Sequence, residues 1–422
     1  MKLVNNLLAG TAGKSRYLLI GIIAVAFLIR LGMLFGFTDF NSSSNAGGDP
    51  YPEMATRLLH NQGLSVYVVN KGIRPITTHG PLYPALAAAV LFVSGNSWLI
   101  VRLAQLLLSV ASVLLVFHVA RRAADVAAGI VAAALVTIYL PLVQFSSELL
   151  TETLFTFLLI LILYLGLRLV QEWTGRLALF LGVAMGLLAL TKFKGIFVAV
   201  IFLPLLLFIG RKRKLPLRWA VVPCLVALLV YSPWVVRNSL IEHTFVPLGS
   251  GAGNSLISGM PAKEQRSVYK GVDKSGTSAQ RNDTALKRGI EEILKKPGSF
   301  IADSGRHFLQ MWLNLGFDKS PSKGSILFAL TNTFSLLAGA AGAVILWRRG
   351  SPGRDLVSMV TITLIAFTAI HMATLADGRY SVPLLPLVFV VASLPLARVY
   401  AALRARRSGN RDSVTAKPLK LP

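Results

Sequence analysis

Long apolar runs alternate with short polar or basic stretches along almost the whole chain. A helix needs about 20 residues to cross the ~30 Å hydrocarbon layer of a bilayer, and several of these runs approach that length. The pattern predicts an all-α polytopic membrane protein with about ten transmembrane helices, at residues 17–36, 98–120, 127–143, 154–169, 177–190, 196–209, 219–231, 325–347, 356–375 and 381–399. One further apolar run, residues 81–94, is too short to span and predicts a juxtamembrane helix on the outer surface.

Two longer polar segments interrupt this alternation. The first, residues 37–84, contains most of the acidic residues of the first third of the chain. The second, residues 233–324, has helical spacing in its later part, broken at Pro297, and is expected to be partly helical. The predicted organisation is an N-terminal transmembrane module, an extracytoplasmic loop, C-terminal transmembrane helices and a basic cytoplasmic tail, at residues 1–232 (with the catalytic outer loop 37–84), 233–324, 325–400 and 401–422.

The composition agrees with a membrane protein and explains the strong positive charge. Of the 422 residues, 54% are hydrophobic and 14% charged, whereas a soluble domain is about one quarter charged. The formal net charge is +25, but much of the excess lies in short loops beside apolar runs, as at Arg121-Arg122 and Arg348-Arg349. Because lysine and arginine accumulate on the cytoplasmic side, these clusters predict cytoplasmic termini and a lipid bilayer as partner, with no nucleic acid.

The outer side of this predicted topology gathers an unusual set of polar groups. Asp49 in the first outer loop is the leading candidate for a base, because a carboxylate held at the membrane surface can deprotonate a hydroxyl. Asp39 and Glu53 are the alternatives in the same loop. Several basic residues and one further acid, Glu152, come from the same side, mostly from separate helix ends. Basic residues placed there can neutralise an anionic leaving group. The basic residues are His79, Arg102, Lys192, Lys194, Arg237 and Arg379.

Each of these residues also has a simpler structural explanation. Asp49 follows two glycines and precedes a proline, a context in which aspartate forms turns. Charged residues at helix ends often only cap the helix or extend to the membrane surface. No zinc motif is present, whereas a divalent metal held by Asp49 and Glu152 remains an alternative; no nucleotide-binding glycine motif is found.

Eight sequence segments in order resemble the GT-C superfamily of membrane glycosyltransferases, within it the dolichyl-phosphate-mannose–protein mannosyltransferase and aminoarabinose-transferase-like group. They are GGDPYPEMATRLLHNQG, HGPLYPALAAAV, RLAQLLLSVASVLLVFHVARR, FSSELLTETLF, LLALTKFKG, SPWVVRNSLIEHTFVPL, ALKRGIEEILKKPGSFIADSGRHFLQMW and GRYSVPLLPL. No single segment is specific for this superfamily, but the eight segments in this order, on the expected side of the membrane, are specific for it. The resemblance covers most of the chain.

The resemblance implies transfer of a sugar from a polyprenyl-phosphate donor to an acceptor on the extracytoplasmic face, with inversion at the anomeric carbon. Carried over, Asp49 is the base and Glu152 a second acid near the acceptor or a metal. The donor phosphate would be held by Lys192 or Lys194, Arg237 and Arg379, with His79 as a polar contact. One departure concerns spacing: the family acid is expected about four residues before the tyrosine, whereas Asp49 precedes Tyr51 by two, which leaves Asp39 and Glu53 open.

Two other functions fit a polytopic chain of this kind. A lipid or oligosaccharide flippase or transporter would place its ionisable groups near the bilayer midplane and often shows internal repeats. An inactive subunit of an envelope assembly would explain the unusual spacing of Asp49. The expected location is the plasma (inner) membrane of a bacterium, and the acceptor is a protein, a glycolipid or a polysaccharide.

Overall fold

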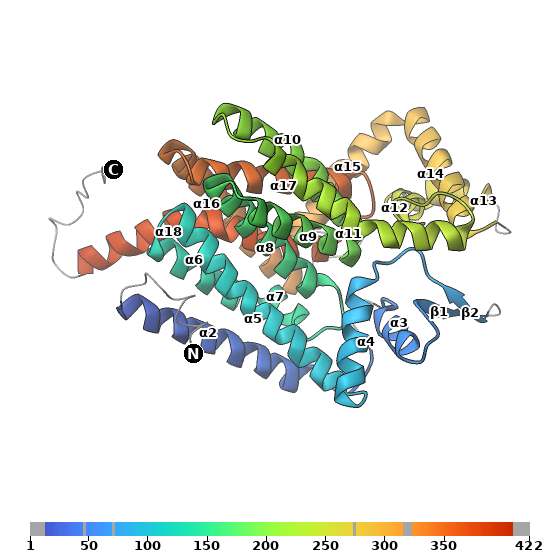
Figure 1. The fold of residues 1–422 in the computed structure, drawn as a ribbon, viewed down its shortest axis with the longest axis horizontal. Coiled ribbons are helices and arrows are strands. Elements are labelled where there is room, and N and C mark those ends of the chain that lie inside the picture. The colour runs from blue at the N-terminus through green and yellow to red at the C-terminus, as the bar shows by residue number, and fades with distance from the viewer. Residues whose placement is uncertain (1–12, 45–47, 70–71, 273–275, 315–322, 408–422) are drawn as a thin grey trace.

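The computed structural model describes residues 13–44, 48–69, 72–272, 276–314 and 323–407. The chain is almost entirely helical, and the described part contains one antiparallel pair of short strands (Figure 1). The N-terminal half contains α2 (Gly13–Phe37), α3 (Tyr51–Leu59), β1 (Ser65–Val68), β2 (Gly72–Pro75), α4 (Leu82–Ser94), α5 (Trp98–Ala123), α6 (Val126–Ile138), α7 (Leu140–Phe145), α8 (Glu152–Glu172), α9 (Gly175–Thr191), η1 (Phe193–Gly195), α10 (Ile196–Lys212) and α11 (Arg218–Glu242). The C-terminal half contains α12 (Ala252–Ser258), α13 (Ala262–Lys270), α14 (Ser278–Lys295), α15 (Pro297–Leu313), α16 (Lys323–Arg349), α17 (Gly353–Met372), η2 (Gly378–Tyr380), η3 (Val382–Leu384) and α18 (Leu385–Arg407).

The all-α polytopic fold is confirmed, but ten full spans are not. Eight helical segments in the described chain are long and apolar enough to cross a membrane, namely α2, α5, α8, η1 with α10, α11, α16, α17 and η2 through α18. The predicted spans at 127–143 and 177–190 correspond to the shorter apolar helices α6 and α9. The first ends early because Tyr139 adopts an extended backbone and the separate helix α7 begins at Leu140, with Pro141 in its first turn.

Helix α11 runs further than the sequence pattern predicted. The expected span ended at residue 231, before Pro233, but the helix continues through this proline to Glu242. Prolines are tolerated inside membrane helices because neighbouring groups satisfy the freed carbonyl. Arg237 therefore belongs to a helix and not to the start of a loop. The surface helix at 81–94 and the break at Pro297 are both confirmed, as α4 and as the α14–α15 junction.

The two ends of the helix bundle differ in character. Arg122 pairs with Glu172 at 2.7 Å and Arg213 with Asp355 at 2.6 Å, so the basic ends of α5 and α10 lie with the end of α8 and the start of α17. Helix α2 begins and α18 ends at this side of the molecule (Figure 1). The hairpin β1–β2 and helices α3, α12, α13 and α14 lie at the opposite end.

The two most deeply packed spans carry groups of the candidate site at their ends. In α8 and in the segment η2–α18, 78% of the most apolar window is buried inside the protein, against 22% for α2. Large side chains of the outer helices, such as Leu28, Leu229 and Leu337, are exposed and form the lipid-facing surface. The buried Arg30 has a structural role: its guanidinium donates to the Val136 and Thr137 carbonyls at the end of α6.

Candidate functional site

A cavity of about 370 Å³ lies at the end of the bundle that also carries α3 and α12. Its polar lining comes from chain segments far apart in sequence: the turn before α3, the residues before α4, the start of α8, the end of α9 and the turn before α18. Its apolar wall includes Phe155, Phe367 and Leu384. Of the predicted site residues, it brings together Asp49, His79, Glu152, Lys192, Lys194 and Arg379.

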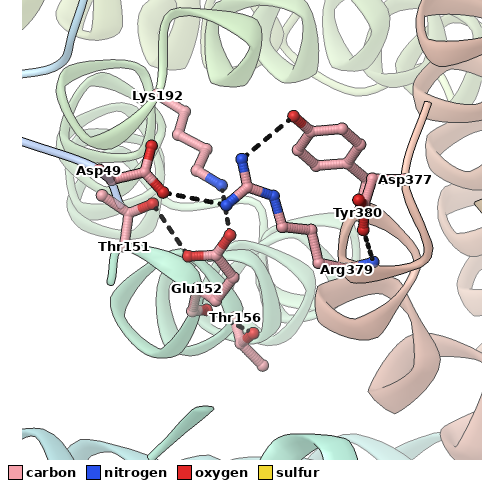
Figure 2. A network of polar contacts seen from close by, with 8 residues as sticks. All are labelled: Asp49, Thr151, Glu152, Thr156, Lys192, Asp377, Arg379 and Tyr380. Atoms are coloured by element: carbon pink, nitrogen blue, oxygen red, sulfur yellow. Dashed lines mark hydrogen bonds and ion pairs between the residues drawn. The ribbon is translucent and has the colours of Figure 1, made fainter. Parts of the chain in front are cut away.

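Two ion pairs dominate the cavity (Figure 2). Arg379 Nη1 lies 2.9 Å from Asp49 Oδ2, and Lys192 Nζ lies 3.0 Å from Glu152 Oε1. The side chain of Glu152 is 3% exposed and that of Asp49 is 20% exposed. Each of the two acids therefore has a cation within hydrogen-bond distance, which offsets the cost of removing its carboxylate from water.

Local backbone structure places both acids at helix N-termini. Glu152 is the first residue of α8, and Asp49 lies two residues before Tyr51, the first residue of α3. The positive end of a helix dipole favours a carboxylate at such a position. The Thr151 hydroxyl also donates to Glu152 Oε2 at 3.3 Å, which restrains the carboxylate (Figure 2). Arg379 is positioned by a tight turn in which its own N–H donates to the Asp377 carboxylate at 2.8 Å.

Tyr380 gathers the three cations of the cavity around one aromatic ring. The charged groups of Lys192, Lys194 and Arg379 lie 5.7, 5.5 and 5.2 Å from the ring centroid. A tyrosine ring attracts cations through its negative face and lowers the cost of holding like charges together. Lys194 Nζ donates to the Thr374 hydroxyl at 3.3 Å, and no described carboxylate lies within 4.0 Å of it. By formal charge, the three cations of the cavity exceed its two carboxylates by one.

His79 reaches the cavity through a close backbone approach. A Cβ atom at Gly80 would lie 2.3 Å from the Leu190 carbonyl oxygen, so only glycine lets this loop pack against the end of α9 beside Lys192. The His79 ring packs edge-on against Tyr51, and its Nδ1 lies 2.8 Å from the Thr78 hydroxyl. Burial lowers the pKa of His79 below its usual value, and Lys192 lowers it further against the opposing effect of Asp49. The ring is therefore mainly neutral at pH 7.

Four predicted residues lie away from the cavity. Arg102 donates to the Ser42 and Ser44 carbonyls at 2.9 and 3.1 Å, and Arg237 donates to those of Leu64 and Ile76 at 2.9 and 2.8 Å. Both guanidiniums hold the polar segment 37–84 against the bundle, so the structure does not bring them to the predicted phosphate site. Glu53 pairs with Arg57 and accepts the Tyr67 N–H, and neither Glu53 nor Asp39 lines the cavity.

Replacement of Arg237 by Gln is expected to destabilise the protein without removing a cavity charge. The change leaves the Leu64 and Ile76 carbonyls without their charged donor and removes the stacking on Trp234, whose ring centroid is 4.5 Å away. Loss of such hydrogen bonds costs about 1–3 kcal/mol, which lowers the unfolding midpoint by a few degrees. Thermal unfolding of the detergent-solubilised protein measures this effect. An unchanged midpoint would contradict the structural role.

Sequence reasoning missed part of the cavity wall. Tyr380 follows Arg379 directly, so the Arg-Tyr pair was a usable signal for an aromatic partner of the cations. His371 also lines the cavity, and its Nδ1 lies 2.7 Å from the Phe367 carbonyl oxygen. Asn254 comes from a Gly/Ser-rich stretch without any motif, and only the fold brings it to the cavity.

The cavity does not have the donor set of a metal site. Over the described ranges, no group of three or more His, Cys, Asp or Glu residues could hold a metal ion. The two cavity carboxylates, Asp49 and Glu152, are each engaged by a cation instead. The residues present therefore do not fit a divalent metal held by these two acids.

Comparisons with known proteins agree with this architecture. Residues 78–236 match the family model of dolichyl-phosphate-mannose-protein mannosyltransferase, a segment that contains Glu152, Lys192 and Lys194. No curated protein matches the chain in sequence. In the cavity, Glu152, Lys192 and Lys194 of the matched segment lie with Asp49 and Arg379, which are outside that segment.

Solved structures with a similar fold include an archaeal oligosaccharyltransferase. AglB from Archaeoglobus fulgidus, in complex with an inhibitory peptide and a dolichol-phosphate, is 16% identical with a TM-score of 0.59, over 97% of this chain and 53% of its own. The oligosaccharyltransferase of the same organism, tethered with an acceptor peptide, is 16% identical with a TM-score of 0.61, over 96% and 52%. ArnT from Cupriavidus metallidurans bound to undecaprenyl phosphate has a TM-score of only 0.41 at 16% identity, over 96% and 81%.

The chain spans about half the length of the oligosaccharyltransferase chains that it matches. At this identity the likeness concerns the fold. Together with the family match, it confirms the resemblance to GT-C membrane glycosyltransferases.

Proposed function

We propose that this protein transfers a sugar from a polyprenyl-phosphate donor to an acceptor, with inversion at the anomeric carbon and with Asp49 as the base. The observation that carries the proposal is the cavity in which Asp49 meets Arg379, Lys192 and Lys194 at one end of a membrane bundle. A carboxylate and a group of cations are the two elements that this reaction needs, one for the attacking group and one for the leaving phosphate.

The ion pairs suggest how the donor prepares the site. A donor phosphate next to Lys194 would compete with Asp49 for Arg379, because an arginine binds phosphate at least as well as carboxylate. As Arg379 turns towards the phosphate, the Asp49 carboxylate becomes available to accept a proton. Glu152 stays buried and keeps Lys192 oriented, and its carboxylate is the second acid near the acceptor.

The chemical step is a single displacement. Asp49 accepts the proton of the acceptor nucleophile, whose electron pair forms the new bond to the anomeric carbon. The bond between that carbon and the phosphate oxygen breaks, and the electron pair leaves with the polyprenyl phosphate. Lys192, Lys194 and Arg379 stabilise the charge on this leaving group. Attack from the face opposite the phosphate inverts the configuration.

The proposed location is the bacterial inner membrane, with both termini in the cytoplasm and the cavity on the outer side. The basic ends of α5 and α10 support this orientation, because they lie at the opposite end of the bundle from the cavity. The candidate charges lie at one end of the helices and not midway along them, which favours transfer at the membrane surface over transport. Protein, glycolipid and polysaccharide all remain candidate acceptors.

A reconstituted assay tests the proposal. The purified protein in proteoliposomes is given radiolabelled polyprenyl-phosphate sugars, one at a time, with envelope extract as acceptor. Transfer of label from at least one donor to a fraction of the extract is expected. Failure with every polyprenyl-phosphate sugar, in liposomes where the protein is folded, would contradict the proposed function.

Replacement of Tyr380 separates the role of its ring from that of its hydroxyl. The Tyr380→Leu variant loses the aromatic face shared by three cations and is expected to raise the donor KM about tenfold, since each cation–π contact contributes about 0.5–2 kcal/mol. The Tyr380→Phe variant keeps the ring and should stay within about threefold of the wild type. Initial rates at varied donor concentration measure both. Equal KM values for the two variants would show that the ring is not used.

A further inference from the structure

A second, polar hollow adjoins the cavity and is formed largely by the segment that contains α12, α13 and α14. The hollow beside the cavity is lined by Thr78, Ser250, Asn254, Tyr269, Val272, Ser278 and Arg281. Two of these residues, Thr78 and Asn254, also line the cavity itself. The two spaces therefore share a wall, and a molecule in the outer hollow lies next to the cavity that contains Asp49.

Helix α13 lines this hollow through Tyr269 and also carries a row of exposed cations, and the hollow and this row together are termed the groove. Lys263, Arg266 and Lys270 lie three and seven residues apart, hence on one helix face, and line a further hollow. In the part of the chain that the structure describes, none of the three has a carboxylate within 4.0 Å. By contrast, the neighbouring Lys296 pairs with Glu292 at 2.8 Å.

The length of this row indicates a polymer. At a rise of 1.5 Å per residue, the cations from Lys263 to Lys270 extend over about 10 Å. A single phosphate or carboxylate cannot contact all of them. A chain with repeated negative charges can, and it would gain from each cation in turn.

The lining chemistry favours a carbohydrate chain over a lipid surface or a peptide. Hydroxyl and amide groups line the hollow beside the cavity. Tyr269 is 38% exposed, and its ring can pack against a sugar face. Val268, the one aliphatic residue of α13 larger than alanine, is buried, so the helix exposes no large aliphatic side chain that could insert into a bilayer.

We propose that this groove binds an anionic polysaccharide, which lies along α13 and reaches the cavity past Asn254 and Thr78 as the sugar acceptor. The inference rests on the proposed function, because the end of the polysaccharide must meet the donor in the cavity. The inference narrows the proposed acceptor from a protein, a glycolipid or a polysaccharide to a polysaccharide.

A binding experiment without donor tests this inference. The full chain in nanodiscs of neutral lipid is titrated with polygalacturonate, neutral dextran and poly-glutamate, and its binding to phosphatidylglycerol vesicles is measured in parallel. We expect polygalacturonate to bind most tightly, with an affinity that falls as salt rises. Replacement of Lys263, Arg266 and Lys270 by Gln should weaken it at least about tenfold. The matched control replaces Arg211, Lys212 and Lys214 by Gln at the opposite end of the bundle and should bind like the wild type.

The Tyr269→Ala variant adds a test specific to sugar. It should weaken polygalacturonate binding and leave poly-glutamate binding unchanged. The inference is overturned if polygalacturonate does not bind, if the α13 variant binds it normally, or if poly-glutamate or the vesicles bind equally tightly. Because no donor is present, each of these results leaves the proposed sugar transfer standing. An inactive transfer assay, conversely, leaves the binding result intact.

Discussion

The Asp49→Asn variant is expected to lose transfer activity by about 10²–10⁴-fold, the usual contribution of a positioned general base. An asparagine side chain has nearly the shape of aspartate but cannot accept the proton of the attacking group. It also no longer competes for Arg379, whose Nη1 lies 2.9 Å from Asp49 Oδ2 in the present structure. The donor KM should therefore stay the same or fall while kcat drops. Initial rates in proteoliposomes at varied donor concentration measure both constants.

Two matched variants make this result specific. Asp39→Asn and Glu53→Gln remove a carboxylate from the same outer loop, but neither residue lines the cavity. Glu53→Gln also breaks the 2.8 Å pair with Arg57, so a small loss of stability is expected without a loss of kcat. Full activity in Asp49→Asn, or an equal loss in either control, would remove Asp49 from the role of base.

The transmembrane helices could be predicted from hydrophobic pattern because their length is set by the bilayer. The hydrophobic pattern predicted helix boundaries wrongly where a proline or an extended residue lies within or next to an apolar run. Tyr139 and Pro141 divide an apolar run into α6 and α7, although every residue there is compatible with a membrane helix. Pro233 had the opposite effect, because its apparent breaking signal was overridden inside the bundle and α11 continued to Glu242.

The candidate site could be predicted only in part, for a related reason. The sequence indicates which polar groups lie at the same end of the helices, and six of the predicted residues do line one cavity. Sequence does not indicate which arginines reach that cavity and which hold backbone carbonyls. Arg379 and Arg237 both lie at outer helix ends, yet one binds Asp49 and the other the Leu64 and Ile76 carbonyls.

Both halves of the chain contribute lining residues to the cavity. Arg379 and Tyr380 come from the turn before α18, more than 300 residues after Asp49. The N-terminal module at 1–232 therefore does not form the cavity alone. This pairing depends on how α18 packs among α5, α6 and α8, and no local motif encodes it.

Lys194 is expected to contribute most to donor binding among the cavity lysines. Lys192 is engaged by Glu152 at 3.0 Å, whereas Lys194 has a hydroxyl partner, Thr374, and contributes the excess positive charge. An incoming phosphate can therefore pair with Lys194 without displacing a carboxylate. Its replacement by Gln should raise the donor KM about 100-fold, since loss of one partner of a buried charge pair costs about 2–5 kcal/mol.

The control for this change is Arg237→Gln, which removes one positive charge that does not line the cavity. Its donor KM should stay within about threefold of the wild type, because its effect on the cavity is only long-range and is screened by salt. The Lys194→Gln variant should keep the wild-type unfolding midpoint, since Thr374 also donates to the Ile370 carbonyl and keeps a partner. A normal donor KM in Lys194→Gln would show that the phosphate does not bind beside Tyr380, and the excess charge would then require another explanation.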